Sequence, residues 1–146
     1  MFNPSKDDVR RFFCDAWSRH QRGQPLTPLE TIAIDWVLEH PEYHPDLEDV
    51  DRALAADYPP HAGRENPFLH LSLHLAVTEQ ISIDQPPGIR RAYESLARRH
   101  GSLHAAAHDL IDCLAEAVWQ SQRSGQPLSN DAYLGCVRAK AGLPPA

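Results

Sequence analysis

The placement of proline most constrains what this chain can fold into. A proline inside a helix removes a backbone hydrogen bond and clashes with the preceding turn, so helices tolerate it only at their start. All 13 prolines of the 146-residue chain stand at predicted helix starts or in connectors. The segment Thr27-Pro28-Leu29-Glu30 combines a hydroxyl N-cap, a proline in the first turn and a carboxylate three residues after the cap. This pattern predicts a helix that begins at Pro28.

Similar boundary signals divide the rest of the chain. Serine, threonine or asparagine opens five of the seven predicted segments, and glycine or proline follows or ends each of them. The predicted helices cover residues 6–22, 28–40, 45–58, 67–83, 89–100, 103–123 and 130–142, and residues 59–65 form a loop. No alternating run of branched and aromatic residues indicates a strand. We therefore predict an all-α, single-domain bundle of about five to seven helices over residues 1–146.

The charge of the chain is concentrated in one segment. The net charge is −6, and between Pro28 and Tyr58 nine acidic residues stand against Arg52 alone, which gives that segment −8. An acidic surface repels the phosphates of nucleic acids. We therefore expect no nucleic-acid partner, and the acidic segment favours a cation, a basic protein or simple hydration.

We expect neither a membrane span nor an export signal in this sequence. The longest uncharged apolar run, Pro67–Val77, is too short to cross a bilayer. The three cysteines, Cys14, Cys113 and Cys136, lie far apart without C-x-x-C spacing, and each falls in an apolar helical pattern. We expect a cytoplasmic protein whose cysteines are reduced core residues.

Two histidines stand inside the most apolar stretch of the chain. In NPFLHLSLHLAVTEQ (66–80), His74 lies about 40° around the helix from His70, and Val77 and Ile81 share their face. A buried imidazole has two ring nitrogens that need partners. Some other group must therefore supply partners for these two rings.

The predicted helix 103–123 repeats this arrangement. His108 lies about 40° from His104 on a mainly apolar face, and Asp112 follows one turn later. Two helices with inward histidine pairs can supply four nitrogens to one ion. We predict a divalent-metal site (Zn, Ni, Cu or Fe) formed by His70, His74, His104 and His108, with Asp112 as a fifth ligand or an orienting group.

The histidines also allow a different interpretation. His74 with Thr78, and His108 with Asp112, could be hydrogen-bonded core residues without a metal, or the rings could be exposed. The protein would then be a non-catalytic interaction module. Its acidic segment and its exposed aromatic residues would bind a basic partner or a second copy of the chain.

The role of the motif HPEYH (40–44) also has two interpretations. His40 and His44 either form a surface corner or reach the metal site, as a fifth ligand or a proton shuttle. The exposed aromatic residues of the interaction hypothesis are Tyr43 and Tyr58. No phosphate loop, G-x-S-x-G or dinucleotide fingerprint occurs, so we predict no nucleotide cofactor and assign no catalytic residue.

Three strings of the sequence resemble a known family. NPFLHLSLHLAVTEQ, with HPEYH before it and IDQPPGIR (83–90) after it, resembles the uncharacterised bacterial domain-of-unknown-function family 1841. The resemblance extends from the first residues through HAAAHDLIDCLAEAVWQ (104–120). It implies a short, stand-alone bacterial cytosolic protein, and it brings no activity, cofactor or catalytic residue.

Overall fold

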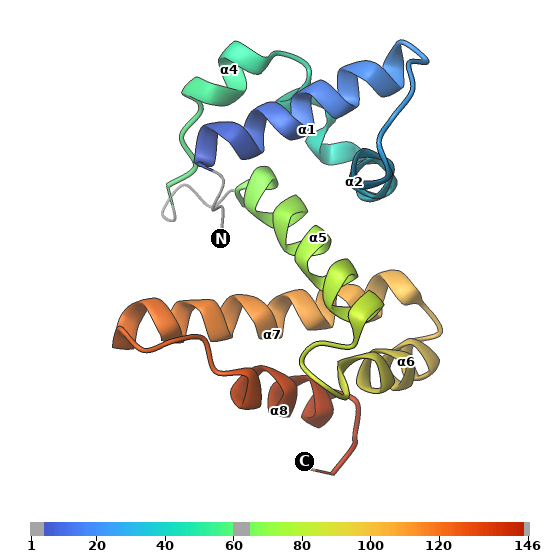
Figure 1. Ribbon diagram of the computed structural model, residues 1–146, viewed down its shortest axis with the longest axis vertical. Coiled ribbons are helices and arrows are strands. Elements are labelled where there is room, and N and C mark those ends of the chain that lie inside the picture. Colours follow the sequence, from blue (N-terminus) through green and yellow to red (C-terminus); the bar gives the residue numbers. More distant parts are fainter. Residues whose placement is uncertain (1–4, 60–64, 145–146) are drawn as a thin grey trace. The chain divides into compact units, whose positions relative to one another are not determined.

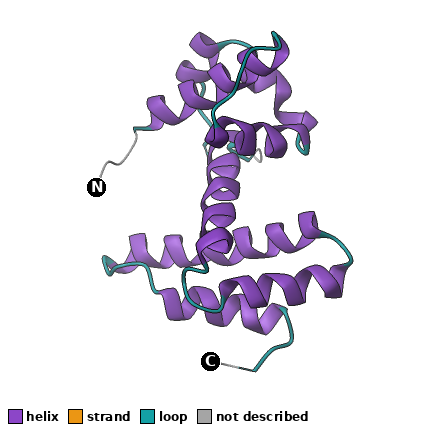
Figure 2. Cartoon of the chain, turned by 45° about the vertical axis from the view of Figure 1, so that its right-hand side comes forward, coloured by secondary structure: helices purple, strands orange, loops and turns teal. Residues whose placement is uncertain are grey.

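The computed structural model describes residues 5–59 and 65–144. In these residues it contains eight α-helices, one short 3-10 helix and no strand. Figure 1 shows the course of the chain, and Figure 2 shows its helices joined by loops. The all-α prediction is confirmed. Residues 60–64 of the predicted loop lie outside the described residues. By their mutual contacts the residues fall into two compact units, 1–75 and 76–146, so the single domain stays a prediction.

The first unit is built around α1 (Lys6–Gln21). It also contains α2 (Pro28–Leu38), the 3-10 helix η1 (Pro41–Tyr43), α3 (His44–Leu47), α4 (Val50–Ala55) and the start of α5 (Pro67–Ile83). Helix α1 packs against α2, α3 and α4 (Figure 1). The buried core of this unit includes Phe13, Trp17, Ile34, Val37, Leu47, Phe68 and Leu71.

The predicted capping signal at Thr27 is present and connects two helices. Thr27 Oγ1 accepts a hydrogen bond from the backbone N–H of Glu30 at 3.1 Å, and Glu30 Oε1 accepts one from the N–H of Thr27 at 2.9 Å. The other oxygen of Glu30 pairs with Arg19 of α1. The capping box therefore fixes both the start of α2 and its position against α1.

The segment 45–58 differs from the prediction. The structure breaks it into α3 and α4, so a single helix over these residues is wrong. Asp49 has an extended backbone (φ −136, ψ 109), and its Oδ1 accepts bonds from the N–H groups of Asp51 at 3.0 Å and Arg52 at 3.3 Å. An aspartate that caps a new helix competes with continuation of the preceding one, which explains the break.

The second unit contains the end of α5 together with α6 (Ile89–His100), α7 (Leu103–Ser124) and α8 (Asn130–Lys140). Helices α6, α7 and α8 pack against one another in all three pairs (Figure 1). The buried residues of this unit include Val77, Ile89, Leu96, Leu110, Leu114, Tyr133 and Val137. Among the described residues, no helix is both long enough and apolar enough to cross a membrane.

The cysteines correct one expectation from the sequence. Cys113 of α7 and Cys136 of α8 form a disulfide with an S–S distance of 2.05 Å, so the prediction that all three cysteines are reduced is wrong for this pair. Packing of α7 on α8 brings their Cα atoms to 5.8 Å, within the range that a disulfide spans. Cys14 is free and buried, as predicted.

Candidate metal centre

Helix α5 positions the first two histidines of the candidate site. Asn66 Oδ1 accepts hydrogen bonds from the N–H groups of Phe68 at 3.0 Å and Leu69 at 3.2 Å, which fixes the first turn. His70 and His74 then lie on successive turns, four residues apart, on the same face. His70 is 7% exposed and His74 is fully buried at 0%, as the apolar pattern of the helix predicts.

A third histidine reaches this pair from another part of the first unit. His40 lies between the end of α2 and Pro41, which opens η1, and its backbone (φ −128, ψ 65) is not helical. The side chain is only 5% exposed. His40 Nε2 lies 3.0 Å from His74 Nε2, which in turn lies 3.1 Å from His70 Nε2. Three imidazoles therefore turn the same ring nitrogen toward one point.

The other nitrogens of the outer two rings face carboxylates. His40 Nδ1 donates to Glu42 Oε2 at 3.0 Å, and His70 Nδ1 donates to Glu65 Oε1 at 2.8 Å. The hydrogen bond from His40 lowers the pKa of the Glu42 carboxyl, although burial acts in the opposite direction. An ionised carboxylate only accepts hydrogen bonds, so each of these Nδ1 atoms carries a proton.

This proton placement determines what the cluster can bind. A neutral imidazole has one N–H, so Nε2 of His40 and Nε2 of His70 each present a lone pair. Both lone pairs point at Nε2 of His74, at 3.0 and 3.1 Å. Facing lone pairs repel one another, and a cation between them removes the repulsion. The cluster therefore requires a proton or a metal ion among its three nitrogens.

The separations of the nitrogens match a metal site. Zn–N bonds of about 2.0–2.1 Å in tetrahedral geometry place neighbouring nitrogens about 3.3 Å apart. The Nε2 of His74 lies 3.0 Å from that of His40 and 3.1 Å from that of His70, and each of the three rings has a nitrogen within 4.8 Å of a nitrogen of the other two. The two separations from His74 are therefore close to the nitrogen–nitrogen spacing of a tetrahedral site.

Aromatic side chains hold the rings in this orientation. Trp36 of α2 stacks on His74 with a centroid distance of 3.9 Å and an interplanar angle of 17°. Tyr43 stacks on His40 at 5.0 Å and 15°. Stacking on both rings restricts their rotation, so the nitrogens remain directed at one another.

Comparisons with known proteins place the chain in a family. Residues 5–139 match the model of a family described as "Domain of unknown function (DUF1841)". The chain belongs to the DUF1841 family. No curated protein and no solved structure gives a significant match. The resemblance recognised in the sequence is confirmed, and the function must be argued from the residues of this DUF1841 chain.

The second half of the predicted ligand set lies on α7 of the second unit. The rings of His104 and His108 lie beside each other, with centroids 4.3 Å apart, and both residues are half-buried. That His108 takes part in the metal site stays a prediction from the sequence pattern. The side chain of Asp112 is 70% exposed, and its carboxylate lies 3.9 Å from Lys140 Nζ. The side chain of Asp112 therefore points from α7 toward Lys140 at the end of α8.

The HPEYH motif contributes in a way that the sequence left open. Of its two histidines, His40 joins the cluster, whereas His44 Nε2 donates to the carbonyl oxygen of Val37 at 2.9 Å. Tyr43 is 6% exposed, so the expectation of an exposed Tyr43 is wrong. Its ring is buried because it stacks on His40. Tyr58, the other aromatic of the interaction hypothesis, is half-buried.

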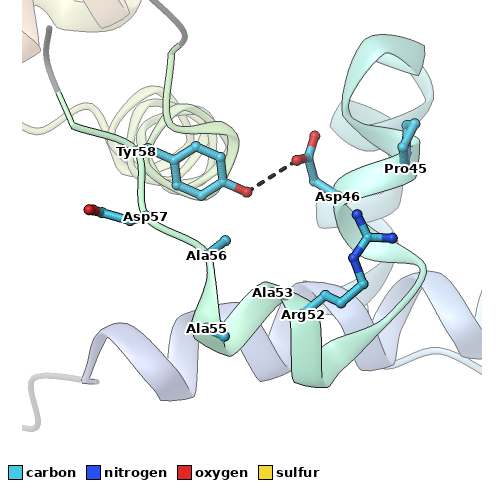
Figure 3. Close-up of a pocket in the computed structure, with 8 residues that line it drawn as sticks. All are labelled: Pro45, Asp46, Arg52, Ala53, Ala55, Ala56, Asp57 and Tyr58. Atoms are coloured by element: carbon cyan, nitrogen blue, oxygen red, sulfur yellow. Dashed lines mark hydrogen bonds between the residues drawn. The ribbon is translucent and has the colours of Figure 1, made fainter. Parts of the chain in front are cut away.

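A separate cavity of about 590 Å³ lies in the first unit, and its described lining residues include none of the histidines of the cluster. Figure 3 shows these residues, which are Pro45, Asp46, Arg52, Ala53, Ala55, Ala56, Asp57 and Tyr58. Tyr58 donates a hydrogen bond from its hydroxyl to Asp46 Oδ1 at 3.1 Å, drawn as the dashed line in Figure 3.

Proposed function

We propose that this protein binds one divalent transition-metal ion through Nε2 of His40, His70 and His74, with His108, a ligand predicted from the sequence, as the fourth. One observation carries the proposal. Nε2 of the buried His74 lies 3.0 Å from Nε2 of His40 and 3.1 Å from Nε2 of His70, while the Nδ1–H groups of the two outer rings donate hydrogen bonds to carboxylates. In metal-ligating histidines, the N–H of the second ring nitrogen characteristically donates a hydrogen bond to a carboxylate or a carbonyl in this way.

The donor set indicates the class of metal. Neutral imidazole nitrogens suit Zn, Ni, Cu and Fe(II), whereas Mg and Ca prefer carboxylate and carbonyl oxygens. Four protein ligands would make a closed site that stabilises the fold. Three protein ligands and a water molecule would leave a position at which an ion can activate water. The contribution of His108 therefore decides between a stabilising and a reactive site.

The proposal for His108 rests on the sequence pattern and on its own helix. His108 lies on the mainly apolar face of α7 and is half-buried, as expected of an inward-facing ligand. His104, predicted from the sequence as a ligand, would instead position His108, because the two rings are in contact. Asp112 is left out of the proposed ligands, because its carboxylate is exposed beside Lys140.

Elemental analysis of the untagged protein tests the proposal. We expect a near-stoichiometric amount of Zn, Ni, Cu or Fe in the purified protein, or after the metal-free protein is reloaded and desalted. His40→Ala, His70→Ala and His74→Ala should each abolish retention. His108→Ala should weaken it and, in the Co²⁺-loaded protein, change the visible absorption spectrum as water replaces the fourth nitrogen.

The control is a histidine outside the cluster. His20 lies at the exposed end of α1, where its ring stacks on Trp17 at 5.6 Å, and His20→Ala should retain the metal fully. If the wild-type protein retains none of the four metals, the histidines are hydrogen-bonded core residues and the proposal is wrong.

A further inference from the structure

Two carboxylates at the protein surface accept hydrogen bonds from the buried histidine cluster. The side chain of Glu42 is 59% exposed and that of Glu65 is 62% exposed, yet each directs one oxygen at a buried ring. Glu42 lies in η1, and Glu65 directly precedes Asn66 and α5, so they come from separate segments. Each accepts the Nδ1 proton of a different proposed ligand.

The electrostatics of a buried ion make this arrangement significant. Neutral imidazoles carry no charge, so a divalent ion held by histidines alone would leave a charge of +2 in an environment that solvates it poorly. The proposed ligands of the first unit are at most 7% exposed. Two ionised glutamates, each one imidazole away from the ion, supply two negative charges.

We propose that Glu42 and Glu65 are the counter-charges and positioning groups of the metal site, an inference that rests on the function proposed above. Each carboxylate holds a ligand histidine in the Nδ1–H form, which leaves Nε2 available for the metal. Each also makes its imidazole more basic and so a stronger ligand. Together they neutralise an ion of charge +2, which favours divalent over monovalent cations.

Tyr43 holds one of these carboxylates in place. Its hydroxyl donates to Glu65 Oε2 at 3.2 Å, while Glu65 Oε1 accepts from His70. The ring of Tyr43 is buried and stacks on His40. Tyr43 therefore connects the ligand His40 with the counter-charge of the ligand His70, and both oxygens of Glu65 are hydrogen-bonded.

Metal affinity in charge-removing variants tests this inference. Zn²⁺ affinity of the full chain is measured at constant pH by competition with a chromophoric chelator. Glu42→Gln and Glu65→Gln keep an oxygen that can accept the Nδ1 proton but remove the charge, and each should weaken Zn²⁺ binding by about 10–100-fold. Tyr43→Phe should weaken it less, because the charge of Glu65 remains.

The chain offers matched controls for these substitutions. Tyr58→Phe removes a hydroxyl from the corresponding pair at the separate cavity, where Tyr58 bonds Asp46 (Figure 3). Glu48→Gln removes an exposed carboxylate after α3. Both variants should bind Zn²⁺ with the affinity of the wild type. Thermal unfolding of the metal-free variants verifies that each one is folded.

A second measurement distinguishes positioning from a general structural effect. Long-range ¹H–¹⁵N spectra of the metal-free protein report which ring nitrogen carries the proton. In the wild type, His40 and His70 should be in the Nδ1–H form, and in Glu65→Ala the His70 ring should shift toward the Nε2–H form. An unchanged His70 tautomer in Glu65→Ala, together with unchanged Zn²⁺ affinity in Glu42→Gln and Glu65→Gln, would overturn the inference and leave the metal site itself intact. A wild type that binds no metal would instead refute the function on which it rests.

Discussion

Replacing His74 with leucine should separate the effect of the metal from the effect of the core. His74 is fully buried, and its ring stacks on Trp36 at 3.9 Å. Leucine has a similar volume and can maintain an apolar contact with Trp36, but it offers no nitrogen. Substitutions that conserve volume in a core usually cost less than about 1.5 kcal/mol. We therefore expect the metal-free variant to remain folded, but to be less stable than the metal-free wild type by about 1–3 kcal/mol, because buried ring nitrogens of His40 and His70 lose a hydrogen-bond partner.

The expected magnitude follows from ligand linkage. At a free metal concentration 100 times the Kd, binding stabilises the wild type by about 2.7 kcal/mol. For a chain of this size, about 3 °C per kcal/mol converts this energy into a Tm increase of about 8 °C. His74 Nε2 is the central nitrogen of the three, so its loss should weaken binding at least 100-fold. At the same metal concentration, the variant should then gain no more than about 0.4 kcal/mol, or about 1 °C.

Thermal melts followed by circular dichroism, with and without Zn²⁺, measure both quantities. A chelator should reverse the shift in the wild type, and His20→Leu, at the exposed end of α1, should keep the full shift. An equal Tm increase in His74→Leu and in the wild type would show that the ion binds elsewhere. In that case the lone-pair argument made for the three nitrogens would be wrong.

Three further predictions concern other features of the fold. Burial raises the pKa of Cys14 to about 11, so this thiol should resist Ellman's reagent at pH 8 until denaturant is added, and rapid labelling of the native protein would contradict its burial. Reduction of the Cys113–Cys136 disulfide, whose sequence separation is 23, should lower the free energy of unfolding by about 3 kcal/mol, measured as a lower denaturant midpoint with reductant present. Backbone hydrogen bonds lower the pKa of Asp84, so its contribution to stability is present above the ordinary carboxyl pKa of about 4 and is lost as the pH falls through the lower folded value. Asp84→Asn should therefore flatten the decrease of Tm at acid pH, and an unchanged acid profile would refute this role.

A helix boundary could be predicted where one capping signal was stronger than the other possible capping residues near it in the sequence. The capping box of Thr27 and Glu30 specifies the start of α2 by contacts three residues apart, and the structure contains both of its hydrogen bonds. The break at Asp49 could not be predicted, because the neighbouring Asp46 and Asp51 are equally able to cap a helix. Packing of α4 on α1 favours one of these possibilities, and that contact joins residues far apart in the sequence.

In the candidate site, too, some features follow from the local sequence and others depend on tertiary packing. The spacing of His70 and His74 on an apolar helix face is a local pattern, and it correctly indicated two buried imidazoles. The approach of His40 depends on how the end of α2 packs, and a proline after a histidine is equally compatible with a surface corner. The disulfide between Cys113 and Cys136 likewise depends on the packing of α7 on α8, which spacing alone does not specify.

The position of His40 outside a regular helix explains how three nitrogens can meet. Two histidines four residues apart on a straight helix point in similar directions, so they define only one edge of a coordination polyhedron. A third nitrogen must arrive from a segment of different direction, and the non-helical backbone of His40 before η1 provides one. Pro41 contributes because it lacks an N–H and ends α2 before His40 can become helical. Glu42 follows two residues after His40 and accepts its Nδ1 proton. The short motif His40–Glu42 therefore supplies a ligand, its direction and its counter-charge, and α5 supplies the other two nitrogens.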